Sequence, residues 1–66
     1  MGYIVLSRKE TESVMLCLAP DADPAAALHE LQKGIFIDVL RIKNQHIKIG
    51  IDAPDSVLVL RGELVK

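Results

Sequence analysis

The chain has 66 residues, half of which are apolar, and its formal net charge at pH 7 is −1. A chain of this length buries only about 60% of the surface that it exposes when unfolded, less than larger domains do. Its single cysteine and two scattered histidines exclude an internal disulfide or a zinc site as reinforcement. We therefore expect one domain over residues 1–66 that associates at least as a dimer, without a cofactor or a metal. The near-neutral charge also argues against purely electrostatic binding of nucleic acid.

Two strands are predicted at the start of the chain. Residues 3–7 (YIVLS) are mostly apolar, and residues 13–18 (SVMLCL) carry large apolar side chains at alternate positions, which is the period of a strand. The polar residues 8–12 between them fit a hairpin connection, although they lack the glycine that tight turns favour. Cys17 lies within the second strand, and we expect it to be a buried small apolar residue.

A helix is predicted over residues 24–33. Asp23 is a good N-cap, the proline that follows it suits the first helical position, and Gly34 stands where a helix-terminating glycine belongs. A helix this short is marginal by itself and must be held by tertiary contacts. We therefore expect Leu28 and Leu31 to be buried against the sheets of a dimer.

A third strand is predicted over residues 35–43 (IFIDVLRIK). Its alternation slips at Val39 and Leu40, which indicates either a bulge or a strand that serves two layers. Asn44 follows in the connection to the next strand, where a tight hairpin requires the positive φ that asparagine tolerates.

The last part of the chain combines two strand patterns with a lone arginine. Residues 46–52 alternate between isoleucine and other residue types, Pro54 begins a turn, and residues 57–60 form a short apolar run. Arg61 follows, where a strand ends and a side chain can extend beyond the sheet; taken alone, it is more simply explained as a solvated strand end. Residues 62–66 leave no room for another helix, so the predicted order is β-β-α-β-β-β.

Several classes of protein are disfavoured. No apolar run approaches the roughly 20 residues of a membrane span, and the N-terminus lacks the basic start of a signal peptide. An unpaired cysteine suits a reducing compartment, so we expect a cytoplasmic protein without a membrane partner. No nucleophile elbow and no glycine-rich phosphate loop is present, and we expect neither enzymatic activity nor a small-molecule substrate.

The sequence resembles the CsrA/RsmA carbon storage regulators, a family of small bacterial RNA-binding translational regulators. The similarity lies in IFIDVLRIK, the turn at Asn44 and Gln45, IKIGIDAP and VLVLRGEL, and in LSRKETE followed by SVML near the start. The predicted helix falls between the second and third strands rather than after the fifth, which is similar to the helix-inserted RsmN (RsmF) type. The family's first hairpin has the pattern L-T-R-R-x-G-E-T, in which Lys9 replaces an arginine and Thr11 replaces the glycine.

The resemblance implies a mainly β fold with one short helix, arranged as an interleaved homodimer of antiparallel sheets. Each of its two RNA sites would combine strand one of one chain with strand five of the other. These sites would bind GGA motifs in single-stranded or hairpin-loop mRNA, or in small regulatory RNA, to control translation or mRNA stability. Carried over by position, the RNA-binding residues are Leu6, Ser7, Arg8 and Lys9 of one chain, and Val57, Val59, Leu60 and Arg61 of the other, with Ala53 and Pro54 nearby.

The residue types suit recognition at a strand edge better than base stacking. Tyr3 and Phe36 are the only aromatic residues, which disfavours a stacking platform. An edge strand, by contrast, offers backbone N–H and C=O groups to the base edges that single-stranded loops expose. The alternative is a protein-interaction module without RNA, which would use the same dimer and present the helix over residues 24–33 as its recognition face.

Overall fold

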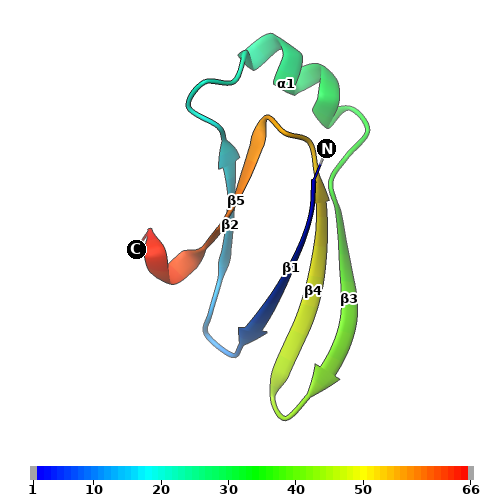
Figure 1. Cartoon of the computed structure of the whole chain (residues 1–66), viewed down its shortest axis with the longest axis vertical. Coiled ribbons are helices and arrows are strands. Elements are labelled where there is room, and N and C mark those ends of the chain that lie inside the picture. Colours follow the sequence, from blue (N-terminus) through cyan, green and yellow to red (C-terminus); the bar gives the residue numbers. More distant parts are fainter. Residues whose placement is uncertain (1, 66) are drawn as a thin grey trace.

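Two antiparallel sheets and one short helix make up the structure, a computed structural model that describes residues 2–65 (Figure 1). One sheet has the strand order β1-β4-β3, and the other pairs β2 with β5. The mainly β class with one short helix is thus as predicted. The elements in chain order are β1 (Gly2–Lys9), β2 (Val14–Leu18), α1 (Pro24–Leu31), β3 (Phe36–Lys43), β4 (His46–Ala53), β5 (Val57–Arg61) and the 3₁₀-helix η1 (Gly62–Leu64).

The end of the chain departs from the predicted order. In place of a tail without a helix, Gly62–Leu64 form η1, whose turn is closed by a hydrogen bond from Val65 N to Gly62 O (3.1 Å). A single 3₁₀ turn needs only one such bond across three residues, so a short tail is long enough for it. The turn is held beside the start of β2, because Gly62 N donates to O of Ser13, the residue before that strand (2.8 Å).

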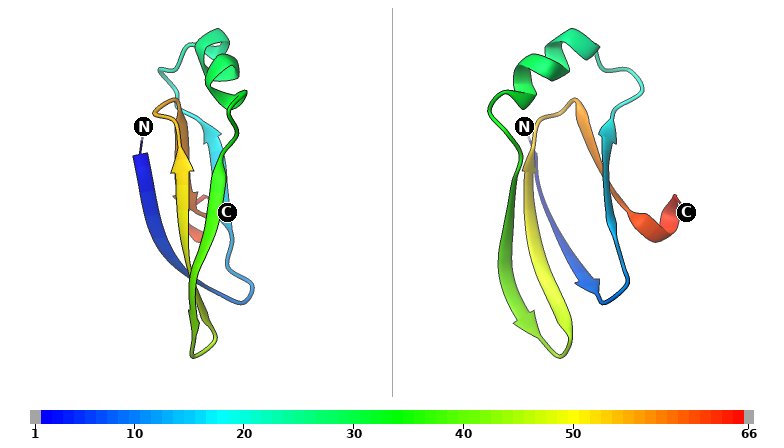
Figure 2. Two further views of the ribbon diagram at one scale, coloured as in Figure 1. Left: turned by 90° about the vertical axis from the view of Figure 1, so that its right-hand side faces the viewer. Right: turned by 180° about the vertical axis from the view of Figure 1, so that it is seen from behind.

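Helix α1 begins as predicted and ends slightly earlier. The side chain of Asp23 accepts a hydrogen bond from a first-turn N–H, and Gly34 follows the helix with φ +83° and donates to Leu31 O (2.9 Å). The helix lies across one end of the sheets (Figure 2) and buries only Ala27, which is 2% exposed. In the single chain Leu28 is 68% exposed and Leu31 is 40% exposed, so their burial against a dimer stays a prediction.

The core lies between one face of the three-stranded sheet and the second sheet. Alternation gives the first sheet an apolar face and a polar face, and Leu6, Ile51 and Ala53 are buried on the apolar one. Their burial removes apolar surface from water and holds the two sheets together. The half-buried residues packed against them are Val14, Ile35, Ile49, Val57 and Val59.

Strand β3 extends the apolar face beyond the reach of the second sheet. Every residue of this strand is exposed, and Ile37, Val39 and Ile42 are 56%, 66% and 71% exposed although they lie on the same face as the core. A contiguous apolar surface of this kind is typical of an interface. The single chain therefore leaves part of its own core face uncovered.

The predicted bulge in the third strand is present and sets which side chains share a face. The register shifts between Val39 and Arg41, so Leu40 is the extra residue opposite β4. An extra residue reverses the alternation, and Ile42 therefore stays on the apolar face while Arg41 and Lys43 lie on the polar one. The following turn has the positive φ values predicted at Asn44, 51° there and 65° at the next residue.

The first hairpin closes with Thr11 at φ 70°, where the CsrA/RsmA pattern has glycine. A β-branched residue in this left-handed conformation is strained by about 1–2 kcal/mol. We expect Thr11→Gly to raise the free energy of unfolding by about 0.5–1 kcal/mol, because the relief of strain exceeds the entropy that glycine adds to the unfolded chain. Urea denaturation measures the change. Thr11→Ala is the control and should gain less; a Thr11→Gly variant less stable than the parent would contradict the strained turn.

Candidate nucleic-acid interface

Arg8 joins the end of β1 to the segment that follows β5. Its guanidinium donates two hydrogen bonds to the carboxylate of Glu63, from Nη1 to Oε1 (2.8 Å) and from Nη2 to Oε2 (3.1 Å). Two further bonds reach backbone oxygens, from Nη1 to Ser13 O (3.1 Å) and from Nε to Ser7 O (2.8 Å). Arg8 is only 7% exposed, and its guanidinium is already paired with groups of the same chain.

The two halves of the predicted RNA site thus approach each other within one chain. Strand β1 hydrogen-bonds to β4 and β5 to β2, so the two strands lie in different sheets and are connected at their ends by the Arg8–Glu63 pair. Strands β1 and β5 each have a second edge that pairs with no strand in the described chain. The combination of strand one with strand five of a second chain stays a prediction.

The ion pair changes the titration of Glu63. Hydrogen bonding to Arg8 is the main cause that lowers the pKa of this carboxyl to about 2, with smaller contributions from a backbone N–H and from the charge of Arg61. The same hydrogen bond raises the pKa of Arg8 above its usual value. Both partners therefore stay charged at every physiological pH.

We expect this pair to make stability depend on pH in the acid range. The folded pKa of Glu63 lies below its usual 4.5, so the stabilisation is fully present above pH 4.5 and is lost as the pH falls towards 2. Melting temperatures of the parent and of Glu63→Gln should therefore differ most above pH 4.5 and converge near pH 2. The matched control is Glu10→Gln, an exposed glutamate in the connection between β1 and β2, close in sequence to Arg8. A Glu63→Gln difference that stayed constant down to pH 2 would contradict the assignment.

The structure separates the predicted site residues by exposure. Ser7, Lys9 and Arg61 are exposed, whereas Leu6 is 8% exposed and contributes its side chain to the core. Leu6 can therefore offer a ligand little beyond its backbone groups. Of the remaining predicted residues, two are buried, Arg8 and Ala53, and the others are half-buried: Pro54, Val57, Val59 and Leu60.

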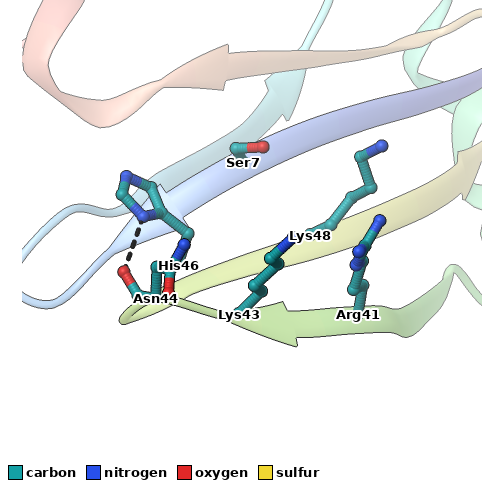
Figure 3. A pocket seen from close by; sticks show the side chains of 6 residues that line it. All are labelled: Ser7, Arg41, Lys43, Asn44, His46 and Lys48. Carbon is teal, nitrogen blue, oxygen red and sulfur yellow. Dashed lines mark hydrogen bonds between the residues drawn. The ribbon is translucent and has the colours of Figure 1, made fainter.

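Sequence reasoning missed two features of this region. The first is Glu63, because nothing in the local pattern links it to an arginine that lies 55 positions away. The second is a polar hollow of about 340 Å³ on the solvent face of the three-stranded sheet (Figure 3). Its position depends on the bulge in β3, because the extra residue decides on which face of the sheet the side chains after it lie. The lining residues are Ser7, Arg41, Lys43, Asn44, His46 and Lys48.

Residues 2–65 contain neither a metal-binding cluster nor a helix that could span a membrane. In this part of the chain no group of three or more histidine, cysteine, aspartate or glutamate side chains is arranged to hold a metal ion. None of its helices has the length and apolar character needed to cross a membrane.

Comparison with known proteins gives concordant matches over nearly the whole chain. The model of the CsrA family, described as the global regulator protein family, matches residues 4–66. Proteins named translational regulator CsrA from Campylobacter jejuni and Desulforamulus reducens are each 36% identical over 63 residues, and that of Borrelia hermsii is 33% identical over 61 residues. These alignments cover 96%, 96% and 92% of this chain but only 64%, 60% and 59% of the relatives, so the chain spans about six tenths of their length.

Proposed function

This chain belongs to the CsrA family of global regulators, and on that premise we propose that it is a post-transcriptional regulator. It binds GGA motifs in single-stranded or hairpin-loop mRNA, and in small regulatory RNA, and so controls translation or mRNA stability in the cytoplasm. The observation that carries the proposal is the family match over residues 4–66. The place of α1 between β2 and β3 supports assignment to the helix-inserted RsmN (RsmF) type.

In this proposal the protein acts as a homodimer. The support is the uncovered apolar surface of β3, where Ile37, Val39 and Ile42 are more than half exposed, together with the unpaired strand edges. An exposed, apolar edge strand invites pairing with another chain, and a second copy related by twofold symmetry satisfies both surfaces at once. Such a dimer would also compensate for the small core of each chain.

Recognition in this proposal divides between backbone and side chains. The open edge of β1 presents backbone groups near Leu6 and Ser7 to the base edges of an unpaired loop. Arg61 supplies a charged fork suited to guanine or phosphate, and Lys9 adds a second exposed charge. Arg8 acts as a positioning residue, because its guanidinium is already saturated by Glu63 and by backbone oxygens.

The proposal is tested by titrating the protein with a GGA hairpin and with the same hairpin carrying CCA. Tighter binding to the GGA hairpin is expected, at a stoichiometry of two sites per dimer, with sedimentation to establish the dimer. Equal binding to both hairpins, or none, would overturn the proposed specificity.

A second candidate is the protein-interaction module, favoured by one observation. Helix α1 leaves Leu28 68% exposed and Leu31 40% exposed, which gives it an apolar surface that a partner could cover. The hairpin titration separates the candidates, because an interaction module without RNA would not distinguish GGA from CCA.

A further inference from the structure

Three cationic side chains converge on the polar face of the three-stranded sheet beside the β3–β4 turn. Arg41 and Lys43 of β3 lie opposite Lys48 and His46 of β4, and their side chains rise from the same side of the sheet (Figure 3). This arrangement depends on the bulge, which places the two β3 cations on the polar face. We call Arg41, Lys43 and Lys48 the basic face.

Within residues 2–65 no acidic side chain neutralises the charges of the basic face. None of its three cations forms an ion pair in this part of the chain, and no carboxylate lines the hollow of about 340 Å³ between them. The next residue of β3 on this side is Asp38, whose carboxylate accepts a hydrogen bond from Tyr3 (3.4 Å). A chain with a net charge of −1 therefore concentrates positive charge in one place, where it attracts an anion.

The spacing of the basic face favours a chain of anions over a single one. Cations on neighbouring strands are about 5 Å apart at the backbone, and those two residues apart on one strand about 7 Å. All three side chains are exposed; Arg41 and Lys48 lie side by side on neighbouring strands, and Lys43 lies two residues further along β3, so they spread over the open surface instead of closing around one ion. A polyanion with regularly repeated charges, such as an RNA backbone, matches cations spread in this way.

The basic face is continuous with the β1 half of the proposed RNA site. In the strand register Ser7 lies opposite Lys48, and Lys9 lies opposite His46, so β1 and β4 form one surface. Ser7 also lines the hollow itself. An RNA strand held at β1 would pass directly onto these cations.

We propose that the basic face binds backbone phosphates of the RNA segment that flanks the GGA motif. The inference rests on the proposed function and extends it, because these residues add affinity and length of contact without reading bases. Each phosphate contact on a single strand contributes about −0.7 to the slope of log K against log salt concentration. Binding by the basic face therefore adds a salt-dependent component that the GGA contacts alone would lack.

The test compares the parent with Lys43→Gln/Lys48→Gln, two exposed positions where glutamine keeps the chain length and removes the charge. On a GGA hairpin with single-stranded flanks, the double variant should bind roughly tenfold more weakly at 0.15 M salt, and its salt slope should be shallower by about 1.4. The preference for GGA over CCA should be unchanged, because phosphate contacts carry no sequence information. Melting curves and sedimentation establish that the double variant is folded and assembled like the parent.

A charge-compensated variant distinguishes the local site from net charge. Asp21 lies in the loop between β2 and α1, at the end of the molecule opposite the β3–β4 turn (Figure 1). Adding Asp21→Lys to the double variant restores the net charge, and we expect the weak binding to remain. If the charge-compensated variant recovers the parent affinity, or if the double variant binds as tightly as the parent, the proposed phosphate binding by the basic face is wrong. The proposed GGA recognition would be unaffected by either result. A parent protein that fails to prefer GGA would overturn the proposed function, and this inference with it.

Discussion

Replacing Arg61 with alanine is expected to weaken binding of a GGA hairpin by about 1–3 kcal/mol per site, which corresponds to roughly 5- to 150-fold in affinity. Arg61 is exposed at the end of β5, and its neighbour Glu63 is already held by two hydrogen bonds from Arg8. Within residues 2–65 no hydrogen bond or ion pair engages the Arg61 guanidinium, which can therefore make a bidentate contact with guanine. Fluorescence anisotropy with a labelled hairpin measures the loss.

Arg61→Lys is the matched control because it keeps the charge and removes the planar fork. If Arg61 reads a base, the lysine variant should lose preference for GGA over CCA while its salt slope stays close to that of the parent. A lysine variant with unchanged preference would show that the arginine contributes only charge. If the alanine variant binds the hairpin as tightly as the parent, Arg61 does not contact the RNA.

Replacing Ile51 with alanine is expected to lower the free energy of unfolding by about 2–5 kcal/mol. Ile51 is 1% exposed, and the strand register places it between Ile4 of β1 and Ile37 of β3 at the centre of the sheet. Truncation leaves a cavity in the core between the two sheets as well as removing buried apolar surface. A loss of this size is a large part of the stability of a small domain, so RNA binding should weaken along with it.

Ile51→Val is the matched comparison and should lower the free energy of unfolding by about 0.5–1.5 kcal/mol. This smaller loss can still be measured if the alanine variant does not fold. Ile42→Ala serves as a second comparison, because Ile42 is 71% exposed in the single chain. If β3 lies at a dimer interface, Ile42→Ala should destabilise the protein in a concentration-dependent way. An Ile51→Ala variant as stable as Ile42→Ala would contradict the described core.

Local features of the fold were predictable because short-range chemistry determines them. Asp23 as an N-cap, the positive φ of Asn44 and the bulge near Val39 each depend on a few neighbouring residues. The period of two likewise separated the apolar and polar faces of each strand. Strand partners are different, because alternation says which face is buried and not which strand lies beside it. The pairing of β1 with β4 could not be read from the residues alone.

The candidate site was predictable in position and less so in the roles of its residues. The family resemblance located Arg8 and Leu6, but their burial depends on Glu63 and on the core, which are distant in sequence. Because Arg8 is buried, the proposed mechanism assigns it a positioning role in place of the expected direct contact with RNA. The basic face was not predictable from simple alternation, because one extra residue in β3 moves Arg41 and Lys43 to the polar face.

The pairing of β1 with β4 also constrains how this chain reaches its native state. Strand β1 can form its backbone hydrogen bonds only when β4 is beside it, and Arg8 can form its ion pair only when Glu63 is in place. Contacts between such distant parts of a chain slow folding, because the loop between them must close before they stabilise anything. We expect folding well below the speed of helical domains of equal size, with the N-terminal strand unprotected from proteolysis until β4 is in place. The folding rate of this chain is then limited more by the sequence separation of its paired strands than by its length.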